Sequence, residues 1–494
     1  MKRGAILFMM IIATVAPAYS ADDVVSRAMK LYEKRHYEEA AAAIRAEYAS
    51  LDSAKRGAAQ LTLGMIYLKN AELHRELYRV SSVVSQDYLK KLSAAPGRDR
   101  SSFADLYEGE ALLETGKAAM AVIYLEKFAA KEGVEPRYRD LAKVSQGLCF
   151  YLNNDKQKAE SLWAGIALSD PEVKCELAAA YSKAGLREMD PVSLCNECLA
   201  ELKRTGKAPS MRLLKNALGV YARSGLSDKG FDLLRQADLK SFSYREVLGK
   251  SKVISFYDLS LCGDLATLYL QASISALEKA AADARVRDAA EFYLGQAYAL
   301  AGNIEQSVKV TASFTSTSQM PQPYKDRIRV WQAANLYQRG RQTDAVGEWD
   351  QLSRKQPEAP DLIAEILLVC GRLRIDCPRV AQKAVAAVEA GEGRRFSTLN
   401  AAIGRYYLGK QDYAKAMTYL EAGRDKGNKN KIESNDPAML VGLSEAYYHT
   451  KKFSEALEIY FEMSKQYPVV RQLQEALQGV YAMEHKSAGD VKIF

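Results

Sequence analysis

The stretch LSEAYYHTKKFSEALEIYFEMSKQYP, residues 443–468, decides the fold. Its small residue Ser444 is followed three positions later by Tyr447. Ala456 comes nine positions after that, Tyr460 four further on, and Pro468 eight further again. Apolar residues at helical spacing on both sides of a polar Thr-Lys-Lys segment predict two amphipathic helices joined by a turn. The stretch therefore predicts a helical hairpin that ends at a proline.

The same pattern recurs along the chain, which predicts a repeat protein. A second copy has the same spacings of three, nine, four and eight, and consists of Gly147, Phe150, Ala159, Trp163 and Pro171. The small residue lets two helices approach closely, and the aromatic residue fills the space between neighbouring pairs. Partial copies begin at Gly64, Gly109, Ala178, Leu218, Gly295 and Gly404.

These residues resemble the tetratricopeptide-repeat family, whose repeat carries Leu-Gly-x-x-Tyr, then Ala-x-x-x-Phe, then Pro. The resemblance implies an all-α solenoid of stacked antiparallel helix pairs that form a superhelix. We expect a first array over residues 21–238, a partly helical junction over 239–282 with a polar, Ser-rich start, and a second array over 283–494. No convincing strand alternation is found, and 70–92 reads as one long helix. Residues 313–323, 391–395 and 423–437 read as loops by composition.

Residues 1–20 have the composition of a secretory signal peptide. Lys2 and Arg3 precede an apolar run over 5–15, and small residues up to Ser20 indicate cleavage there. The apolar run is too short to span a bilayer, and no later stretch is apolar enough. We therefore expect an exported, periplasmic protein without a transmembrane segment. The formal charge of +8 on 494 residues is small, and together with export it argues against nucleic-acid binding.

Hydrophobic residues make up 48% of the chain and charged residues 26%, as in folded soluble proteins. Sequence motifs typical of enzymes, such as Gly-x-Ser-x-Gly, His-Glu-x-x-His and the phosphate-binding glycine-rich loops, do not occur. Only four histidines are available for acid–base chemistry near neutral pH. We expect no catalytic residue, no metal and no cofactor.

A solenoid binds its partners along an extended concave surface. The resemblance places that surface on the first helix of each pair, on the side away from the small and aromatic contacts. Aromatic and amide groups there would hold an extended peptide by stacking and hydrogen bonding. The residues at the matching positions are Gln296, Trp331, Asn335, Gln338, Arg405, Glu445 and Tyr448.

Two cysteine pairs are candidates for disulfides. Cys195 and Cys198 form a Cys-x-x-Cys motif without the strand-then-helix context of thioredoxin, so inert thiols, a structural disulfide and a redox pair all stay open. Cys370 and Cys377 flank Gly371, and either a disulfide across a helix turn or two free thiols would fit. On one straight helix their seven-residue separation would place them about 10 Å apart, too far for a disulfide.

These observations lead to three hypotheses of function. The first is a non-catalytic scaffold or adaptor that binds other envelope proteins and supports an outer-membrane, secretion, pilus or polysaccharide-export complex. The second is a periplasmic thiol-linked accessory of oxidative folding or cytochrome maturation that uses Cys195 and Cys198. The third is a solenoid that binds a glycan polymer along its groove.

Overall fold

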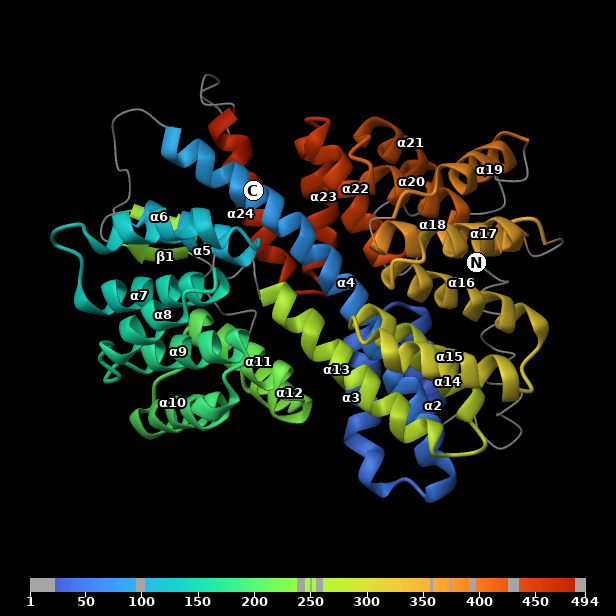
Figure 1. Cartoon of the computed structure of the whole chain (residues 1–494), viewed down its shortest axis with the longest axis horizontal. Helices are drawn as coiled ribbons and strands as arrows, with labels where there is room; N and C mark the ends of the chain where they lie inside the picture. Colours follow the sequence, from blue (N-terminus) through green and yellow to red (C-terminus); the bar gives the residue numbers. More distant parts are fainter. Residues whose placement is uncertain are drawn as a thin grey trace. The chain divides into compact units, whose positions relative to one another are not determined.

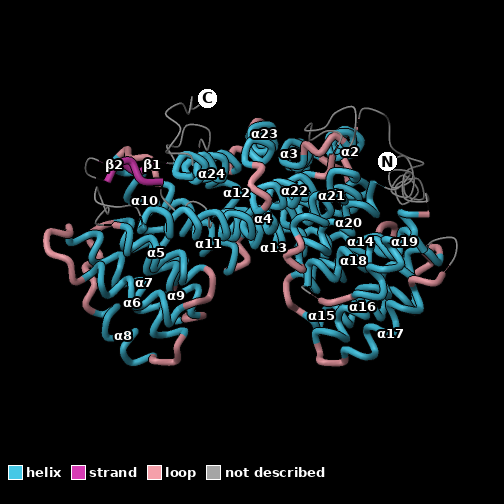
Figure 2. Tube along the Cα trace, turned by 90° about the horizontal axis from the view of Figure 1, so that it is seen from above, coloured by secondary structure: helices cyan, strands magenta, loops and turns pink. Residues whose placement is uncertain are grey.

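The computed structural model describes residues 23–94, 103–237, 245–248, 251–254, 261–355, 359–373, 375–390, 397–424 and 435–484. Helices dominate these residues and stack side by side within each part of the chain (Figures 1 and 2). The predicted all-α solenoid is confirmed. The chain divides into two compact units, each made of two segments. Unit 1 comprises 1–73 and 272–462, and unit 2 comprises 74–271 and 463–494.

Unit 1 consists of helix pairs that follow one another along the chain. One pair, α2 with α3, stands at its start, and a series of regular pairs follows from α14. The long helices α4 and α13 each contribute one part to the unit. Its elements are α2 (Val24–Glu33), α3 (Tyr37–Glu47), η1 (Tyr48–Ser50), part of α4 (Ser53–Ala94), part of α13 (Leu261–Ala281), α14 (Arg287–Leu300), α15 (Ile304–Thr317), α16 (Gln322–Gln338), α17 (Gln342–Leu352), α18 (Ala359–Leu373), α19 (Pro378–Glu389), α20 (Ser397–Gly409), α21 (Tyr413–Gly423), α22 (Pro437–His449) and most of α23 (Phe453–Ser464).

Unit 2 contains the remaining parts of α4 and α13 and a second series of pairs. Its elements are α5 (Ala104–Glu114), α6 (Ala118–Ala129), α7 (Pro136–Leu152), α8 (Lys156–Ala164), α9 (Pro171–Ala184), η2 (Arg187–Met189), α10 (Pro191–Thr205), α11 (Met211–Arg223), α12 (Ser227–Gln236), β1 (Arg245–Leu248), β2 (Ser251–Ile254) and α24 (Val470–Glu484). The boundaries expected after residues 238 and 282 do not coincide with those of the two units.

The glycines of the repeat pattern mark the contact between the two helices of a pair. A Cβ atom on Gly147 of α7 would lie 2.2 Å from Nε1 of Trp163 on α8, and one on Gly404 of α20 would lie 2.5 Å from Cγ of Leu420 on α21. Real Cβ atoms do not approach so closely, so only glycine permits these helix pairs to pack as they do. The repeated small residue therefore performs the role that the sequence pattern predicted.

A hydrogen bond between the two helices of a pair shows that most of unit 2 is inserted in the sequence of unit 1. In the regular pair α14–α15, the Ser307 hydroxyl donates to the Gly295 carbonyl at 2.8 Å, twelve residues apart. Between α13 and α4, also in unit 1, the equivalent bond runs from the Ser273 hydroxyl to the Gly64 carbonyl at 2.7 Å, across 209 residues. The first part of α4 and the second part of α13 thus form one repeat of unit 1. Nearly all of unit 2 lies between them in the sequence.

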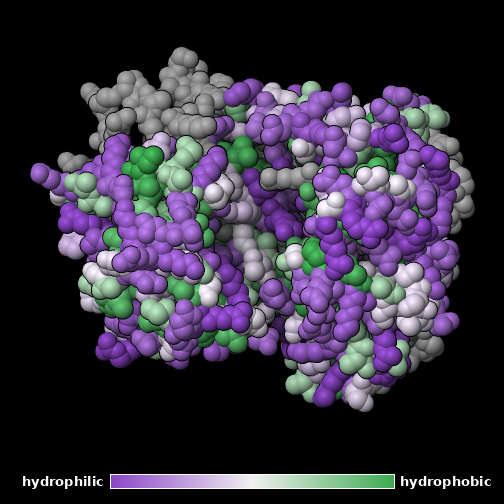
Figure 3. All heavy atoms as spheres, in the orientation of Figure 1, coloured by the Kyte–Doolittle hydropathy of each residue, from purple (hydrophilic) through white to green (hydrophobic). Residues whose placement is uncertain are grey.

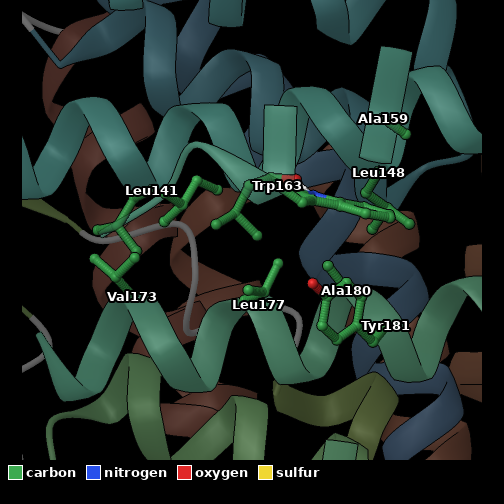
Figure 4. Packing of buried hydrophobic residues seen from close by; sticks show 10 residues of the cluster. Leu141, Leu148, Ala159, Trp163, Val173, Leu177, Ala180 and Tyr181 are labelled. Carbon is green, nitrogen blue, oxygen red and sulfur yellow. Dashed lines mark hydrogen bonds between the residues drawn. The ribbon is translucent and has the colours of Figure 1, made fainter. Parts of the chain in front are cut away.

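The core of a repeat is seen around Trp163 (Figure 4). Its indole lies over the helix that carries Leu177 and Tyr181, and the rings of Trp163 and Tyr181 meet edge to face at 5.2 Å between centroids. The indole N–H donates to the Val144 carbonyl at 3.0 Å. Apolar contact on both faces and a satisfied N–H together fix the ring between α7, α8 and α9.

The structure also contains features that the sequence did not predict. Residues 245–248 and 251–254 pair as an antiparallel hairpin, with Arg245 opposite Ile254. Four-residue strands are too short for apolar alternation to stand out, which explains why none was predicted. Helix α15 continues to Thr317, so the loop expected over 313–323 is shorter than predicted. The long helix expected over 70–92 is confirmed within α4, and the loop expected over 391–395 falls outside the described residues.

Helix α11 begins at a side-chain cap, which gives a first testable prediction. The Ser210 hydroxyl accepts a hydrogen bond from the backbone N–H of Leu213 at 3.2 Å. Replacing Ser210 with Ala is expected to lower the free energy of unfolding by about 1 kcal/mol, because that N–H then lacks a partner. Urea unfolding followed by circular dichroism measures the difference. Ser210→Asp restores the acceptor and should leave stability near that of the natural protein.

Candidate functional site

The first helices of the unit 2 pairs form one continuous surface. Helix α5 packs against α7, α7 against α9, and α9 against α11. These are the helices that the resemblance assigns to the concave binding surface. Charged residues of α5, α9 and α11, together with one asparagine, form a network on this surface. We call it the inner network, and it consists of Glu110, Glu114, Glu176, Lys183, Arg212, Lys215 and Asn216.

Arg212 lies at the centre of the inner network. Its Nη1 is 3.0 Å from Oε1 of Glu110 and 3.3 Å from Oε2 of Glu176, and its Nη2 is 3.3 Å from Oε2 of Glu110. The Asn216 amide donates to the same oxygen of Glu176 at 2.8 Å. The side chains of Arg212, Glu110 and Glu176 are 4%, 6% and 9% exposed. One guanidinium therefore hydrogen-bonds to two buried carboxyl groups, and it joins α5, α9 and α11.

A second group of charges lies at the edge of the network. Lys215, which is buried, places its Nζ 3.0 Å from Oε1 of Glu114, and Lys183 pairs with the same oxygen. About a quarter of each of the Glu114 and Lys183 side chains remains exposed, 25% and 26%. The Tyr78 hydroxyl of α4 donates to the Glu114 carbonyl at 2.8 Å. This edge is the part of the network that solvent reaches.

A small polar cavity opens beside these charges. It lies among α5, α7 and α9, and Leu113 and Leu148 add apolar surface to it. Its polar lining consists of Glu110, Glu114, Ser145, Glu176 and Lys183. Donors and acceptors thus converge on one hollow, which has room for about one water molecule.

The two glutamates of α5 respond to these surroundings in opposite directions. Burial raises the pKa of Glu110 to about 7, further raised by the nearby Glu176 charge and only partly offset by Arg212. Burial also acts to raise the pKa of Glu114, but Lys183 and Lys215 outweigh it and hold that pKa well below its usual range. At neutral pH Glu114 is ionised, while Glu110 is protonated in part of the molecules.

The Glu110 shift predicts a pH dependence of stability. Its pKa is about 7 in the folded protein against a reference value of 4.5, so the folded state holds more protons between these values. The Glu110 contribution to stability is therefore present below about pH 4.5 and is lost as the pH rises through 7. Glu110→Gln should remove this slope. Thermal unfolding of both proteins from pH 5 to 8 measures it, with Glu114→Gln as the matched control on the same helix. Parallel profiles for the natural protein and Glu110→Gln would contradict the assignment.

The groove residues expected from the sequence all lie in unit 1, and the structure places them differently. Gln338 is exposed and Arg405 is half-buried. The others are buried: Gln296, Trp331, Asn335, Glu445 and Tyr448. These five side chains are buried in this structure and do not line an accessible groove, so their role in binding stays a prediction.

The inner helices of unit 1 are covered by the beginning of the same unit. Glu72 of α4 pairs with Arg372 of α18 at 2.7 Å, and both side chains are 10% exposed. The Arg35 Nε, just after α2, donates to the Asn435 carbonyl at 3.1 Å. The Trp331 indole N–H is satisfied by Oε1 of Glu365 at 3.1 Å. Contacts within unit 1 therefore occupy the surface that the sequence assigned to a partner.

The sequence analysis did not predict the inner network of unit 2, although the repeat pattern could have identified one of its residues. Gln296, Arg405 and Glu445 each follow the small residue of a first helix, and the same rule applied to Gly109 selects Glu110. Arg212 and Lys215 follow no such landmark. Only the packing of α11 against α9 brings them to the carboxylates.

The structure contains one disulfide, and the other cysteines are free thiols. Cys370 and Cys377 are joined by a disulfide with Cα atoms 6.5 Å apart, and the second lies just beyond the end of α18. Cys195 and Cys198 are free and buried on α10. Among the described residues, no three His, Cys, Asp or Glu side chains are placed to hold a metal ion. Within the same residues, no helix is both long and apolar enough to cross a membrane.

The architecture and the inner surfaces define a helical-repeat protein. Residues 401–468 match the family model of the tetratricopeptide repeat, which covers α20 to α23. The resemblance expected from the sequence is thereby confirmed: the chain contains tetratricopeptide repeats. Proteins built from this repeat bind other proteins.

Matches to solved structures were also found. Yeast Tom70 is 14% identical, with 94% of this chain and 95% of that chain covered and a TM-score of 0.31. The Cut9–Hcn1 hetero-tetramer of APC/C is 13% identical, with 93% and 90% covered and a TM-score of 0.28. The TPR domain of P58(IPK) is 15% identical, with 71% and 98% covered and a TM-score of 0.19. A search of curated proteins finds no match.

Proposed function

We propose that this protein is a non-catalytic scaffold of the bacterial cell envelope and that it binds a protein partner through the inner surface of unit 2. The observation that carries the proposal is the polar cavity beside Glu114 and Lys183 on the first helices. Both side chains are partly exposed and oppositely charged, so an incoming segment can hydrogen-bond to either. The repeats supply a long rigid surface on which further weak contacts add up.

We place the binding surface on unit 2 because the inner helices of unit 1 are already covered by other residues of unit 1. In unit 1 the pair of Glu72 with Arg372 and the contacts of Arg35 occupy the inner helices. In unit 2 a hollow remains beside α5, α7 and α9. A partner therefore reaches the exposed edge of the inner network, at Glu114 and Lys183, without displacing the buried pairs of Arg212.

Photo-crosslinking in intact cells tests the binding surface. A photoreactive amino acid is placed at Lys183 or Glu114 on the inner surface, and at Glu160 on the outer helix α8 as a matched control, since Glu160 is exposed. We expect discrete crosslinked proteins from the first two positions and none from the third. Products that resist protease but are degraded by glycosidases would instead identify a glycan ligand. Equal crosslinking from all three positions would overturn the proposed surface.

The envelope location rests on the composition of residues 1–20 and has its own test. The mature protein should begin at Ala21 and appear in the periplasmic fraction. N-terminal sequencing after cell fractionation measures both. A cytoplasmic protein that begins at Met1 would overturn the location and leave the protein-binding role standing.

A further inference from the structure

A disulfide closes the turn between α18 and α19 in unit 1. Cys370 lies in the last turn of α18, and Cys377 directly precedes Pro378, the first residue of α19. We call the chain closed between these two cysteines the disulfide ring. Within it, the backbone N–H of Ile375 donates to the Cys370 carbonyl at 2.8 Å. The disulfide thus fixes the end of α18, and the end of a helix is the part that frays most readily.

Arg372 belongs to the disulfide ring and contacts the inner surface of unit 1. Its Nη2 lies 2.7 Å from Oε1 of Glu72 on α4, and both side chains are 10% exposed. Its guanidinium carbon lies over the ring of Trp331 on α16, 5.7 Å from the centroid, which is the distance of a cation–π contact. Trp331 itself is fully buried. Arg372 therefore covers Trp331 and at the same time holds α4 against the inner helices.

A second charged residue of the disulfide ring contacts α20. The Asp376 carboxylate accepts a hydrogen bond from the Tyr406 hydroxyl at 2.8 Å, and it pairs with Nζ of Lys410 at 2.7 Å. The backbones of α18 and α20 also approach closely, since a Cβ atom on Gly371 would lie 3.5 Å from the Arg405 carbonyl oxygen. Charged side chains of one short ring therefore connect α18 to both α4 and α20.

We propose that the disulfide between Cys370 and Cys377 is a redox lock on the inner surface of unit 1, opened by a dithiol reductant. One thiolate of the reductant attacks a sulfur of the disulfide, breaks the S–S bond and releases the other cysteine as a thiolate. The second thiol of the reductant then loses its proton, attacks the mixed disulfide and expels the first cysteine. In total, the protein disulfide is reduced to two thiols, and the two thiols of the reductant are oxidised to one disulfide.

Opening the lock changes the end of α18 and what it covers. Without the disulfide the last turn of α18 frays, so Arg372 leaves Glu72 and uncovers Trp331. Trp331 is one of the residues that the sequence assigned to partner binding, and in the oxidised protein it is fully buried. The lock concerns unit 1 alone and is independent of the binding surface placed on unit 2.

The remaining cysteines make a reductant specific for this lock. All seven cysteines of the chain lie in its described part, and the five outside the disulfide are already free thiols. A reductant therefore changes only Cys370 and Cys377. Their side chains are 0% and 4% exposed, so the reductant reaches the sulfur atoms when the turn between α18 and α19 opens locally.

The test uses the full-length natural protein labelled with fluorotryptophan, with dithiothreitol as the reductant. The chain has three tryptophans, Trp163, Trp331 and Trp349, so fluorine NMR gives three resonances, and Trp331→Phe assigns one of them. Alkylation and mass spectrometry show when Cys370 and Cys377 are reduced. We expect the Trp331 resonance alone to become sensitive to exchange of H₂O for D₂O, and oxidised glutathione should reverse the change. A disulfide that dithiothreitol does not reduce in the folded protein, or a Trp331 resonance unchanged by reduction, would overturn the proposal.

Amide hydrogen exchange and two variants locate the effect. Reduction should accelerate exchange in the last turn of α18 about ten- to hundredfold, the order of effect that a short disulfide loop has on stability. Cys370→Ser combined with Cys377→Ser should show the same exchange without reductant and no response to it. Cys149→Ala, which removes a buried free thiol, should respond as the natural protein does. Equal acceleration in α7, α8 and α9 of unit 2 would indicate global unfolding and contradict a local lock. If the double variant does not fold, the natural protein with and without reductant decides.

Discussion

Replacing Arg212 with Ala is expected to lower the free energy of unfolding by about 3–5 kcal/mol at pH 8. The change leaves Glu110 and Glu176 buried without the cation that both contact. The cost should shrink at pH 5, because Glu110, whose pKa burial raises to about 7, takes up a proton and loses its charge. Urea unfolding followed by circular dichroism at both pH values measures the difference.

Two control variants separate the charge effect from loss of packing. Arg204→Ala removes an exposed arginine of α10 and should change stability by less than about 0.5 kcal/mol. Arg212→Met combined with Glu110→Gln and Glu176→Gln removes the buried charges together and should recover much of the loss. A penalty for Arg212→Ala that is equal at pH 5 and pH 8 would show that the guanidinium acts mainly through its volume.

Trp163→Ala should destabilise unit 2 by about 3–5 kcal/mol, because it opens a large cavity in a buried cluster. Trp349 of unit 1 is the matched position: its indole N–H donates to the Val330 carbonyl at 3.1 Å, as that of Trp163 does to Val144 at 3.0 Å. Each repeat contacts mainly its neighbours, so we expect the two substitutions to act locally.

Amide hydrogen exchange measures where the stability is lost. Trp163→Ala should accelerate exchange in α7, α8 and α9, and Trp349→Ala in α16, α17 and α18. Ile123→Ala serves as the surface control, since that side chain is 62% exposed. Figure 3 shows such green residues scattered on a largely hydrophilic face. Uniform acceleration along the whole chain in either variant would contradict local packing.

The helix pairs could be predicted from the sequence because their contacts are local. Gly147 and Trp163 meet within one hairpin, so their spacing repeats wherever a hairpin repeats. The partner of Gly64 could not be predicted, because Leu277 and Ser273 lie in a helix far along the chain. The sequence around Gly64 does not indicate that its partner lies 209 positions further along the chain.

The candidate site was predicted only in part for a related reason. The rule for first helices selects Glu110 of the inner network only when it is applied to Gly109 as well. It says nothing about whether an inner surface is already covered. The burial of Trp331 and Tyr448 depends on packing between helices, which the periodicity of α16 and α22 cannot reveal.

The 209 residues between Gly64 and Ser273 have a consequence for synthesis on the ribosome. At a translation rate of about 5–20 residues per second, the apolar side of α4 waits about 10–40 s for α13 to emerge. The hairpins from α5 to α12 are synthesised before that moment, while α4 still lacks its partner. The nascent chain therefore presents an unpaired helix during a defined interval, and that interval is when a chaperone would be needed most.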